Sequence, residues 1–336
     1  MRVDTPTPYN VGVEKVTVTA LARKIPTEDA AYRFMESLRW ANGVVCPHCG
    51  SIAEHYFLTP KATEGRKTRT GSVTPRRLWK CRDCRKQFSV TTGTVMHGSK
   101  VSLQIWLFVI FEMCANKNGI AAREIERKYG VASRTAWFMT HRLREAMVRN
   151  GRGSLMAGVV VSDKTWIGGD PANKHRDKVA RDSSGYMVHH TEKTPVLSLV
   201  DKDTGEVRSR VVPTVNSANL RKVFEQEVDM PRTVLHTDGA SWYNAFAGYV
   251  QRHESVDHMA GEYVRRDVST NRLENYFSQL KRSIDGTFHH VSREHLPRYL
   301  AEFDFRYSTC DMTDSQRMST LLWRADGRRL AYKLCR

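Results

Sequence analysis

The sequence has no long apolar run, and we expect no secretory leader. None of its windows approaches the 18 or more consecutive apolar residues that a membrane-spanning helix needs. The first residues, from Met1 to Pro6, lack the apolar core of a signal peptide. No internal repeat and no low-complexity segment is present either. We therefore expect a cytoplasmic protein with no membrane partner, and its 336 residues with 40% hydrophobic content fit two or three packed domains.

Acidic residues are scarce relative to basic ones. The chain holds 36 Asp and Glu against 53 Lys and Arg, which gives a net charge of +17 and a pI near 9.7. A surface of this sign favours a polyanionic partner such as nucleic acid. Charge alone also fits a protein that is merely soluble or attracted to membranes. If the partner is DNA, we expect the protein to associate with the nucleoid.

Cysteines are few and odd in number, which argues against a disulfide framework. Four of the seven form two close pairs, Cys46-Pro-His-Cys49 and Cys81-Arg-Asp-Cys84. Each pair donates two thiolates from a tight turn, and together they make the ligand set of a structural zinc ion. The flanking segments from Trp79 and from Gln87 are expected as strands, so the sequence predicts a zinc ribbon. His48 is an alternative ligand in a Cys3His site, and chance or redox cysteines are the other interpretation.

Changes in patterning divide the chain into five segments. They are a polar arm (1–28), a helix followed by the zinc ribbon (29–98), a helical DNA-binding segment (99–150), a catalytic domain (151–310) and a basic C-terminal tail (311–336). Within the second segment, a Lys/Arg/Thr-rich insert at 61–77 is expected to form a hairpin tip.

Two predicted helices, residues 121–129 and 134–148, are joined by the turn Gly130-Val-Ala-Ser. This spacing is typical of a helix-turn-helix, although an ordinary helical hairpin has it too. The positive charge and the preceding zinc ribbon favour DNA contact. The residues expected on or near the outer face of the second helix, and hence against DNA, are Arg134, Thr135, His141, Arg142 and Arg144.

From residue 157 the pattern changes to short β-rich runs that alternate with helices. The predicted order is three strands (159–165, 196–201 and 207–212), a helix (218–227), a strand (234–237), a helix (242–246), a short strand (255–258) and a helix (271–284). This is the order of the α/β ribonuclease H-like fold, a mixed sheet covered by helices. The sequence therefore predicts such a domain, preceded by the zinc ribbon and the helix-turn-helix.

Two aspartates end apolar runs in this domain. Asp163 closes Gly-Val-Val-Val-Ser-Asp, and Asp238 closes Thr-Val-Leu-His-Thr-Asp. Cleavage of a phosphodiester by two metal ions needs carboxylates that converge from different elements. Each aspartate alone is weak evidence, because an aspartate at a strand end is more often a turn or capping residue.

Glu274 lies on a predicted helix whose periodicity locates it. The apolar stripe of this helix is Leu273, Phe277, Leu280 and Ile284. Glu274, Ser278 and Lys281 form a second face about 90° away. Glu274 and Lys281 are therefore predicted at the edge of the core, able to point at one substrate. A solvated Glu/Lys face is the plain alternative. The competitors for the third-ligand role are Asn271, Asn275, Asp267 and Asp285.

Several motifs resemble those of bacterial insertion-sequence DDE transposases of the ISXO type. They are Cys46-Pro-His-Cys-Gly-Ser, Trp79-Lys-Cys-Arg-Asp-Cys-Arg-Lys-Gln-Phe-Ser-Val-Thr-Thr-Gly-Thr, Ser162-Asp-Lys-Thr-Trp-Ile-Gly-Gly, His236-Thr-Asp-Gly, Gly261-Glu-Tyr-Val-Arg, Asn271-Arg-Leu-Glu-Asn-Tyr-Phe-Ser-Gln-Leu-Lys-Arg and Gly286-Thr-Phe-His-His-Val-Ser-Arg-Glu-His-Leu. The resemblance extends over residues 28–307 and implies a zinc ribbon before a ribonuclease H-like catalytic domain. Two departures stand out: Lys164 follows the first aspartate where the family usually has a second acid, and Tyr307-Ser-Thr-Cys replaces the usual Tyr-Asn.

The resemblance also implies a function. Asp163, Asp238 and Glu274 would hold two Mg²⁺ (or Mn²⁺) ions, with Lys281 beside them near the DNA. The expected activity is that of a DNA transposase, which binds the terminal inverted repeats of its insertion sequence, cleaves the ends and transfers them to target DNA. The partners would be double-stranded DNA and further copies of the chain, since synapsis requires a homodimer or more. The alternatives are a non-catalytic DNA-binding regulator derived from a transposase, and a ribonuclease or junction resolvase.

Overall fold

The computed structural model describes residues 16–58, 66–67, 73–74, 77–149, 154–168, 184, 193–246, 248–257, 261–262 and 264–331. Much of the predicted arm (1–15), most of the insert at 61–77, and Gly169 and Tyr263 of the quoted motifs lie outside these residues. The chain forms two compact units, one made of residues 1–147 with 311–336 and the other of residues 148–310.

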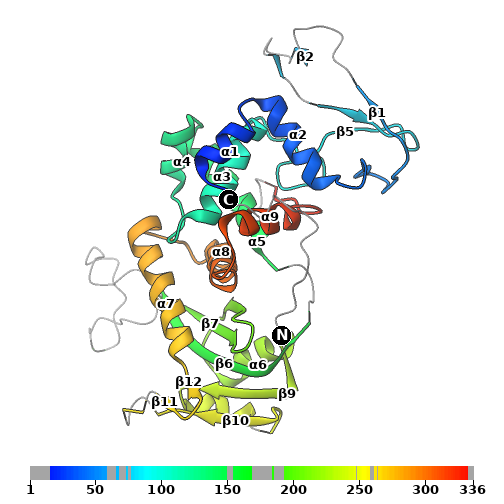
Figure 1. Ribbon diagram of the computed structural model, residues 1–336. Helices are drawn as coiled ribbons and strands as arrows, with labels where there is room; N and C mark the ends of the chain where they lie inside the picture. Colours follow the sequence, from blue (N-terminus) through cyan, green and yellow to red (C-terminus); the bar gives the residue numbers. More distant parts are fainter. Residues whose placement is uncertain are drawn as a thin grey trace. The chain divides into compact units, whose positions relative to one another are not determined.

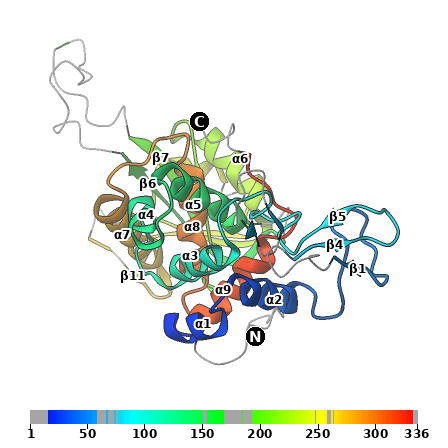
Figure 2. The same cartoon turned by 90° about the horizontal axis from the view of Figure 1, so that it is seen from above.

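The N-terminal unit is built largely from helices. They are α1 (Val18–Lys24), α2 (Glu28–Arg39), α3 (Leu103–Ala115), α4 (Ala122–Tyr129), α5 (Ser133–Met147) and α9 (Asp314–Arg324). Helix α3 is apolar on nearly all sides and packs against α1, α2 and α9 (Figure 2). Neither α3 nor any other helix in the described part of the chain is long and apolar enough to cross a membrane.

Two helices lie in segments that were expected to be irregular. Helix α1 falls in the predicted arm, where the Thr17 side chain caps its first turn. Helix α9 falls in the predicted basic tail, packs against α3 and α5, and buries Met318, Leu321 and Leu322. Thr313 forms a capping box at its start. Residues 314–324 are therefore part of the N-terminal unit, because their apolar stripe has a core to pack against.

The segment with the paired cysteines forms a small antiparallel sheet. Its strands are β1 (Tyr56–Phe57), β4 (Trp79–Lys80) and β5 (Gln87–Phe88), in the order β1-β4-β5. Strands β2 (Arg66–Lys67) and β3 (Val73–Thr74) pair as a separate hairpin in the predicted insert. Edge-on contacts of Trp40 with the rings of Trp79 and Phe88 join this sheet to the end of α2.

The second unit contains a five-stranded mixed sheet, seen in the lower part of Figure 1. Its strands are β6 (Met156–Ile167), β7 (Thr194–Asp201), β8 (Val207–Val211), β9 (Val228–Thr237) and β10 (Arg252–Ser255). Their order is β10-β9-β6-β7-β8; β6, β7 and β8 are antiparallel neighbours, whereas β9 is parallel to both β6 and β10. The predicted order of elements and the α/β ribonuclease H-like fold class are confirmed.

Helices cover both faces of this sheet. One core lies under α6 (Ser217–Glu227) and the 3-10 helix η3 (Ser241–Phe246). The other lies under α7 (Asn271–Ser283), its π-helical extension η5 (Ile284–Phe288) and α8 (Leu296–Ser308). A short hairpin of β11 (Val264–Arg265) and β12 (Val268–Ser269) precedes α7. Side chains alternate along a strand, so Val160 joins the α6 core and Val161 the α7 core. By the same alternation, Asp163 lies on the α7 side.

Candidate active site

Asp163 and Asp238 are brought together by the pairing of two parallel strands. The last paired residues of β6 and β9 are Val161 and His236. Each aspartate follows two residues later, so both carboxylates are at the same end of neighbouring strands and on the same face of the sheet. Buried valines and leucines in β6 and β9 hold these ends in place.

Lys164 lies between the two aspartates. Its Nζ donates to Asp238 Oδ2, and its backbone N–H donates to Asp163 Oδ1 at 2.7 Å. The Lys164 side chain is only 11% exposed, and its ammonium also lies 5.9 Å from the centre of the Trp242 ring. A positive charge thus occupies a position between these strand ends, where the family resemblance would have placed an acid.

Glu274 comes from the first turn of α7, a helix that packs against β6 and β7. Its carboxylate is exposed and accepts a hydrogen bond of 3.2 Å from the Thr270 hydroxyl. A carboxylate in the first turn is favoured by the partial positive charge of the helix N-terminus. Lys281 is also exposed, two turns later on the same helix. Both residues lie outside the buried stripe of α7, as their spacing predicted.

The Asp163 carboxyl interacts electrostatically with the other two carboxylates. The pKa of Asp163 is raised to about 6, chiefly by burial, and the negative charges of Asp238 and Glu274 add to the increase. The neighbouring Lys164 acts in the opposite direction. Such a group of acids favours a bound cation, because the cation relieves repulsion that the protein alone leaves uncompensated.

These carboxylates are spaced more widely than the ligands of a single small ion. In the described part of the chain, the four cysteines are the one group of three or more His, Cys, Asp or Glu residues whose ligand atoms all lie within 4.8 Å of one another. Two metal ions in a phosphoryl-transfer site lie about 3.5–4 Å apart, so the ligands of the pair together span a longer distance than those of one ion. Oxygen donors from two aspartates and a glutamate fit Mg²⁺ or Mn²⁺ chemically.

The cysteine cluster has the dimensions of a tetrahedral zinc site. Cys46 Sγ lies 3.7 Å from Cys84 Sγ, and Cys49 Sγ lies 3.6 Å from Cys81 Sγ. A tetrahedron with Zn–S bonds of about 2.3 Å requires sulfur atoms about 3.8 Å apart. Burial opposes ionisation of Cys81, but hydrogen bonds from the backbone of Cys84 and Asp83 and the neighbouring thiols lower its pKa to about 6. His48 Nε2 lies 3.3 Å from the Gln87 carbonyl oxygen instead, and His48 is not part of the cluster.

The prediction that the basic residues of α5 lie on its outer face is wrong for three of them. Helices α4 and α5 do pack together across Gly130, which adopts a left-handed conformation with φ of 63°. Yet His141, Arg142 and Arg144 are buried and Thr135 is half-buried, so among the five predicted contacts Arg134 is the exposed residue. Helical periodicity gave the angle between residues but not which side the rest of the protein covers.

Arg142 shows what the buried side of α5 does. Its guanidinium donates to the His97 carbonyl at 2.7 Å and lies over the rings of Trp106 and Phe138. Burial lowers its pKa to about 10. Arg142 is therefore a packing residue of the N-terminal unit.

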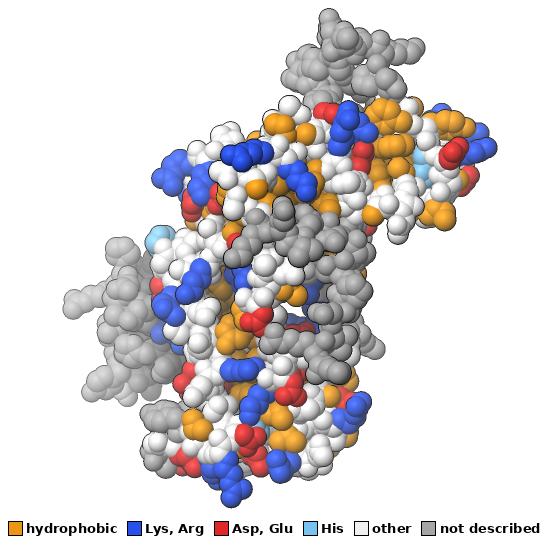
Figure 3. All heavy atoms as spheres, viewed as in Figure 1, with side chains coloured by type: hydrophobic (Ala, Val, Ile, Leu, Met, Phe, Trp, Pro, Cys, Tyr) orange, Lys and Arg blue, Asp and Glu red, His pale blue; other side chains and the backbone are white. Residues whose placement is uncertain are grey.

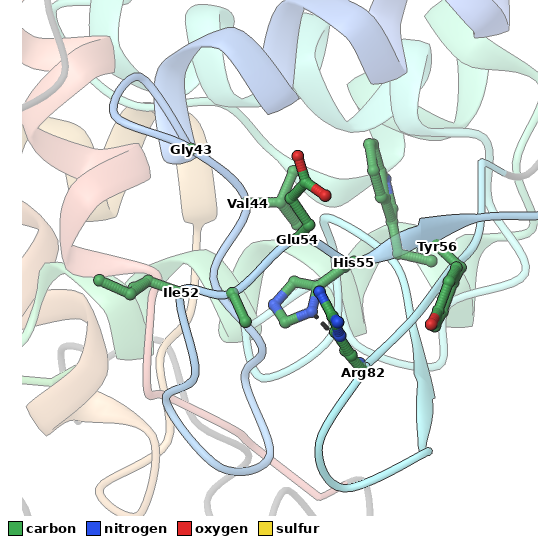
Figure 4. A pocket seen from close by; sticks show the side chains of 9 residues that line it. Gly43, Val44, Ile52, Glu54, His55, Tyr56 and Arg82 are labelled. Atoms are coloured by element: carbon green, nitrogen blue, oxygen red, sulfur yellow. Dashed lines mark hydrogen bonds between the residues drawn. The ribbon is translucent and has the colours of Figure 1, made fainter.

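A separate hollow of about 410 Å³ lies on the zinc ribbon (Figure 4). Its lining includes Ile52, His55, Tyr56, Trp79 and Arg82, and the Arg82 backbone N–H donates to His55 Nδ1 at 3.4 Å. Ile52 is 81% exposed. Across the described residues visible in Figure 3, Lys and Arg side chains are spread among Asp and Glu rather than gathered in one stripe.

Comparison with known families gives the segments their identity. Residues 155–308 match the ISXO2-like transposase domain, and residues 26–87 match a transposase zinc-ribbon domain. Residues 155–308 belong to the ISXO2-like transposase domain family. The sheet, α7 and α8 lie within this transposase domain, and all four clustered cysteines lie within the ribbon segment. The resemblance predicted from the motifs is confirmed.

The chain is also similar to a protein in transposable element ISH50 of Halobacterium salinarum. The two are 26% identical over 301 residues, which cover 88% of this chain and 96% of the relative. Among solved structures, the simian T-cell lymphotropic virus intasome in complex with a PP2A regulatory subunit matches at 12% identity with a TM-score of 0.26, covering 58% of this chain and 65% of that one. The Mos1 strand transfer complex matches at 16% identity with a TM-score of 0.21, covering 59% and 74%. These scores are too low to define a common arrangement.

Proposed function

We propose that this protein is a DDE transposase that cleaves the ends of its insertion sequence and joins them to target DNA. Asp163, Asp238 and Glu274 are the proposed ligands of two Mg²⁺ or Mn²⁺ ions. The observation that carries the proposal is the position of Asp163 and Asp238 at one end of two neighbouring parallel strands, beside the first turn of α7 in a transposase domain.

The chain's own residues divide the work of such a site. Asp163 and Asp238 fix one edge of the site on the sheet, and Glu274 provides the opposite edge from the helix. Bound divalent ions would activate the attacking hydroxyl and stabilise the leaving oxygen. Lys281 is exposed two turns beyond Glu274, and its proposed role is to contact a DNA phosphate. In the protein without metal, the ammonium of Lys164 balances the negative charge of Asp238.

DNA recognition is assigned to the N-terminal unit. Arg134 is exposed at the start of α5, and the first residues of a recognition helix are those that reach base edges. The net charge of +17 supports binding that weakens steeply with salt. Two element ends must be held at once, so we propose that a dimer or larger assembly of this chain is the active form.

The test uses purified protein and labelled duplexes that carry the two ends of the element. With Mg²⁺ or Mn²⁺, the wild type should nick these ends and join them to a target plasmid. Asp238→Asn should abolish cleavage and joining while end binding in a gel-shift assay stays within a few-fold of wild type. Asp267→Asn and Asp285→Asn are matched controls, because both replace exposed acids that flank α7.

The same assay separates the rival functions. A protein that binds the ends but neither nicks nor joins them with either ion would be a regulator rather than an enzyme. Preferential cleavage of RNA/DNA hybrids or branched junctions would indicate a ribonuclease or resolvase. If Asp267→Asn or Asp285→Asn abolishes cleavage and Glu274→Gln does not, the third ligand is assigned to the wrong residue.

A further inference from the structure

A second acid in the transposase domain is bonded to the helix that carries Glu274. Asp304 of α8 is partly buried, and its Oδ1 accepts a hydrogen bond of 2.7 Å from the Tyr276 hydroxyl on α7. The same carboxylate accepts from the Ser209 hydroxyl at 2.7 Å and from the Ser209 backbone N–H at 2.8 Å. One carboxylate thus joins α7, α8 and strand β8.

The hydroxyls around Asp304 form a continuous buried row. Ser198 Oγ lies 2.8 Å from Ser209 Oγ, which lies 2.9 Å from the Tyr276 hydroxyl. Ser198, Ser209 and Tyr276 are each no more than 3% exposed. Ser198 is the strand partner of Asp163 in the sheet. The row therefore runs from the strand position opposite one proposed metal ligand to the helix that bears another.

Filling the core with this row of polar groups costs more free energy than filling it with apolar side chains. A desolvated carboxylate costs free energy even when its oxygens are hydrogen-bonded, and apolar residues of similar size often stabilise a protein as well or better. Unlike apolar contacts, the hydrogen bonds that a carboxylate accepts are directional, so they fix where their donors lie. The two bonds from Ser209 fix the Asp304 carboxylate, and that carboxylate in turn fixes the position of the Tyr276 hydroxyl and the rotation of α7 about its axis.

Glu274 depends on that rotation. It precedes Tyr276 by two residues, or about 3 Å along the helix axis, and lies on the exposed side of α7. Its bond with Thr270 is local to the start of the same helix and does not tie the helix to the sheet. A second contact from α8 reaches the same turn, because the Tyr307 hydroxyl donates to the Arg272 carbonyl at 3.0 Å. Metal ligands must be held within about 0.5 Å of their working positions.

We propose that Asp304 is a positioning residue that holds the Tyr276 hydroxyl, and through it sets the place of the Glu274 carboxylate in the metal site. The inference rests on the proposed role of Glu274 as a metal ligand. It assigns Asp304 and Tyr276 no contact with DNA or with the ions.

The test measures Mn²⁺ binding by calorimetry and by the rise in melting temperature, with no DNA present. Tyr276→Phe removes one hydroxyl and keeps the ring, so the domain should remain folded. Asp304→Asn keeps the shape of the acceptor and removes its charge. Partners that orient metal ligands usually change affinity 10- to 100-fold, so we expect both variants to bind Mn²⁺ about tenfold more weakly. Both substitutions act on the same Tyr276–Asp304 hydrogen bond. The double variant should therefore have the Mn²⁺ affinity of whichever single variant binds Mn²⁺ less tightly.

Glu302→Gln is the matched control. Glu302 is a fully buried acid on the same helix, and its Oε1 accepts from Arg306 of α8 at 2.8 Å. It should lower the melting temperature without changing Mn²⁺ affinity. If Tyr276→Phe and Asp304→Asn bind Mn²⁺ as tightly as wild type while Glu274→Gln does not, the positioning role is overturned. If Glu274→Gln and Asp163→Asn also bind like wild type, the metal site itself is wrong.

Discussion

Lys164 forms an ion pair with Asp238 between the ends of two neighbouring parallel strands. The ammonium places a positive charge beside a site proposed to bind divalent cations. The lysine and the metal ions therefore compete for the same negative field, and the protein without metal depends on the lysine to limit repulsion between Asp163 and Asp238.

Replacing Lys164 by Met should separate these two effects. Removing the competing charge should tighten Mn²⁺ binding about 3- to 10-fold, while the metal-free protein melts at a lower temperature. Differential scanning fluorimetry with and without Mn²⁺ measures both. Lys202→Met serves as the control, because Lys202 pairs with Asp267 at 3.6 Å instead. Unchanged or weaker Mn²⁺ binding by Lys164→Met would show that Lys164 supports the ions rather than competing with them.

The four clustered cysteines should hold one zinc ion per chain. We expect Cys81→Ser to lose the zinc and to unfold the β1-β4-β5 sheet, because such a small sheet has little core of its own. Elemental analysis and limited proteolysis would detect the two losses. Cys310→Ser, at an exposed cysteine outside the cluster, should keep both the metal and the protease resistance. Full zinc content in Cys81→Ser would contradict the site.

Substitutions of Arg142 and Arg134 should have different effects, although both residues lie on α5. The first should lower stability, and the second should weaken DNA binding. Arg142→Met leaves the His97 carbonyl without its donor and should destabilise the N-terminal unit by about 2 kcal/mol. Arg134→Ala, at an exposed position, should leave the urea midpoint unchanged. If Arg134 contacts a phosphate, Arg134→Ala should reduce the magnitude of the negative slope of log K against log salt by about 1. Equal stability of the two variants would refute the packing role of Arg142.

The unfolding free energy of the transposase domain should depend on pH through the titration of Asp304. Burial raises the pKa of this carboxyl from its usual 3.8 to about 6. Below about pH 4 the group is protonated in both the folded and unfolded chain, and its contribution to stability is fully present. As the pH rises to 6, the unfolded chain has released the proton and the folded one still binds it, so this contribution is lost, by at most about 3 kcal/mol.

Asp304→Asn removes this titration, which gives the measurement. Urea melts at several pH values measure the unfolding free energy of both proteins. Relative to the variant, the wild type should lose stability as the pH rises from about 4 to 6. A difference that stays constant over that interval means that Asp304 keeps an ordinary pKa.

Local pattern was enough to predict much of the transposase domain. Apolar runs located β6, and the stripe beside Glu274 located α7, because both depend on side chains near in sequence. The ion pair of Lys164 with Asp238 was not predicted, since it depends on β9 lying next to β6. Asp304 was missed for the same reason. Its partners Ser209 and Tyr276 are distant in the chain and meet only in the folded sheet.

The errors in the N-terminal unit also have physical causes. His141 and Arg144 were expected outside because they are polar, but tertiary packing decides which side of a helix is covered. Residues 311–336 were expected to be a tail because they are basic. The capping pair Thr313 and Gln316 and the apolar stripe that follows them are the local signals that indicate helix α9.

Helix α9 makes the N-terminal unit discontinuous in sequence, since residues 311–336 complete a core that begins near residue 16. The Arg39–Asp326 ion pair and the bond from the Val95 N–H to the Ala325 carbonyl join segments more than 200 residues apart in the sequence. On the ribosome, the transposase domain can therefore finish folding before the unit that precedes it. The sheet of that domain can form once residue 310 has been made, whereas the helical core of the other unit still needs residues 314–324.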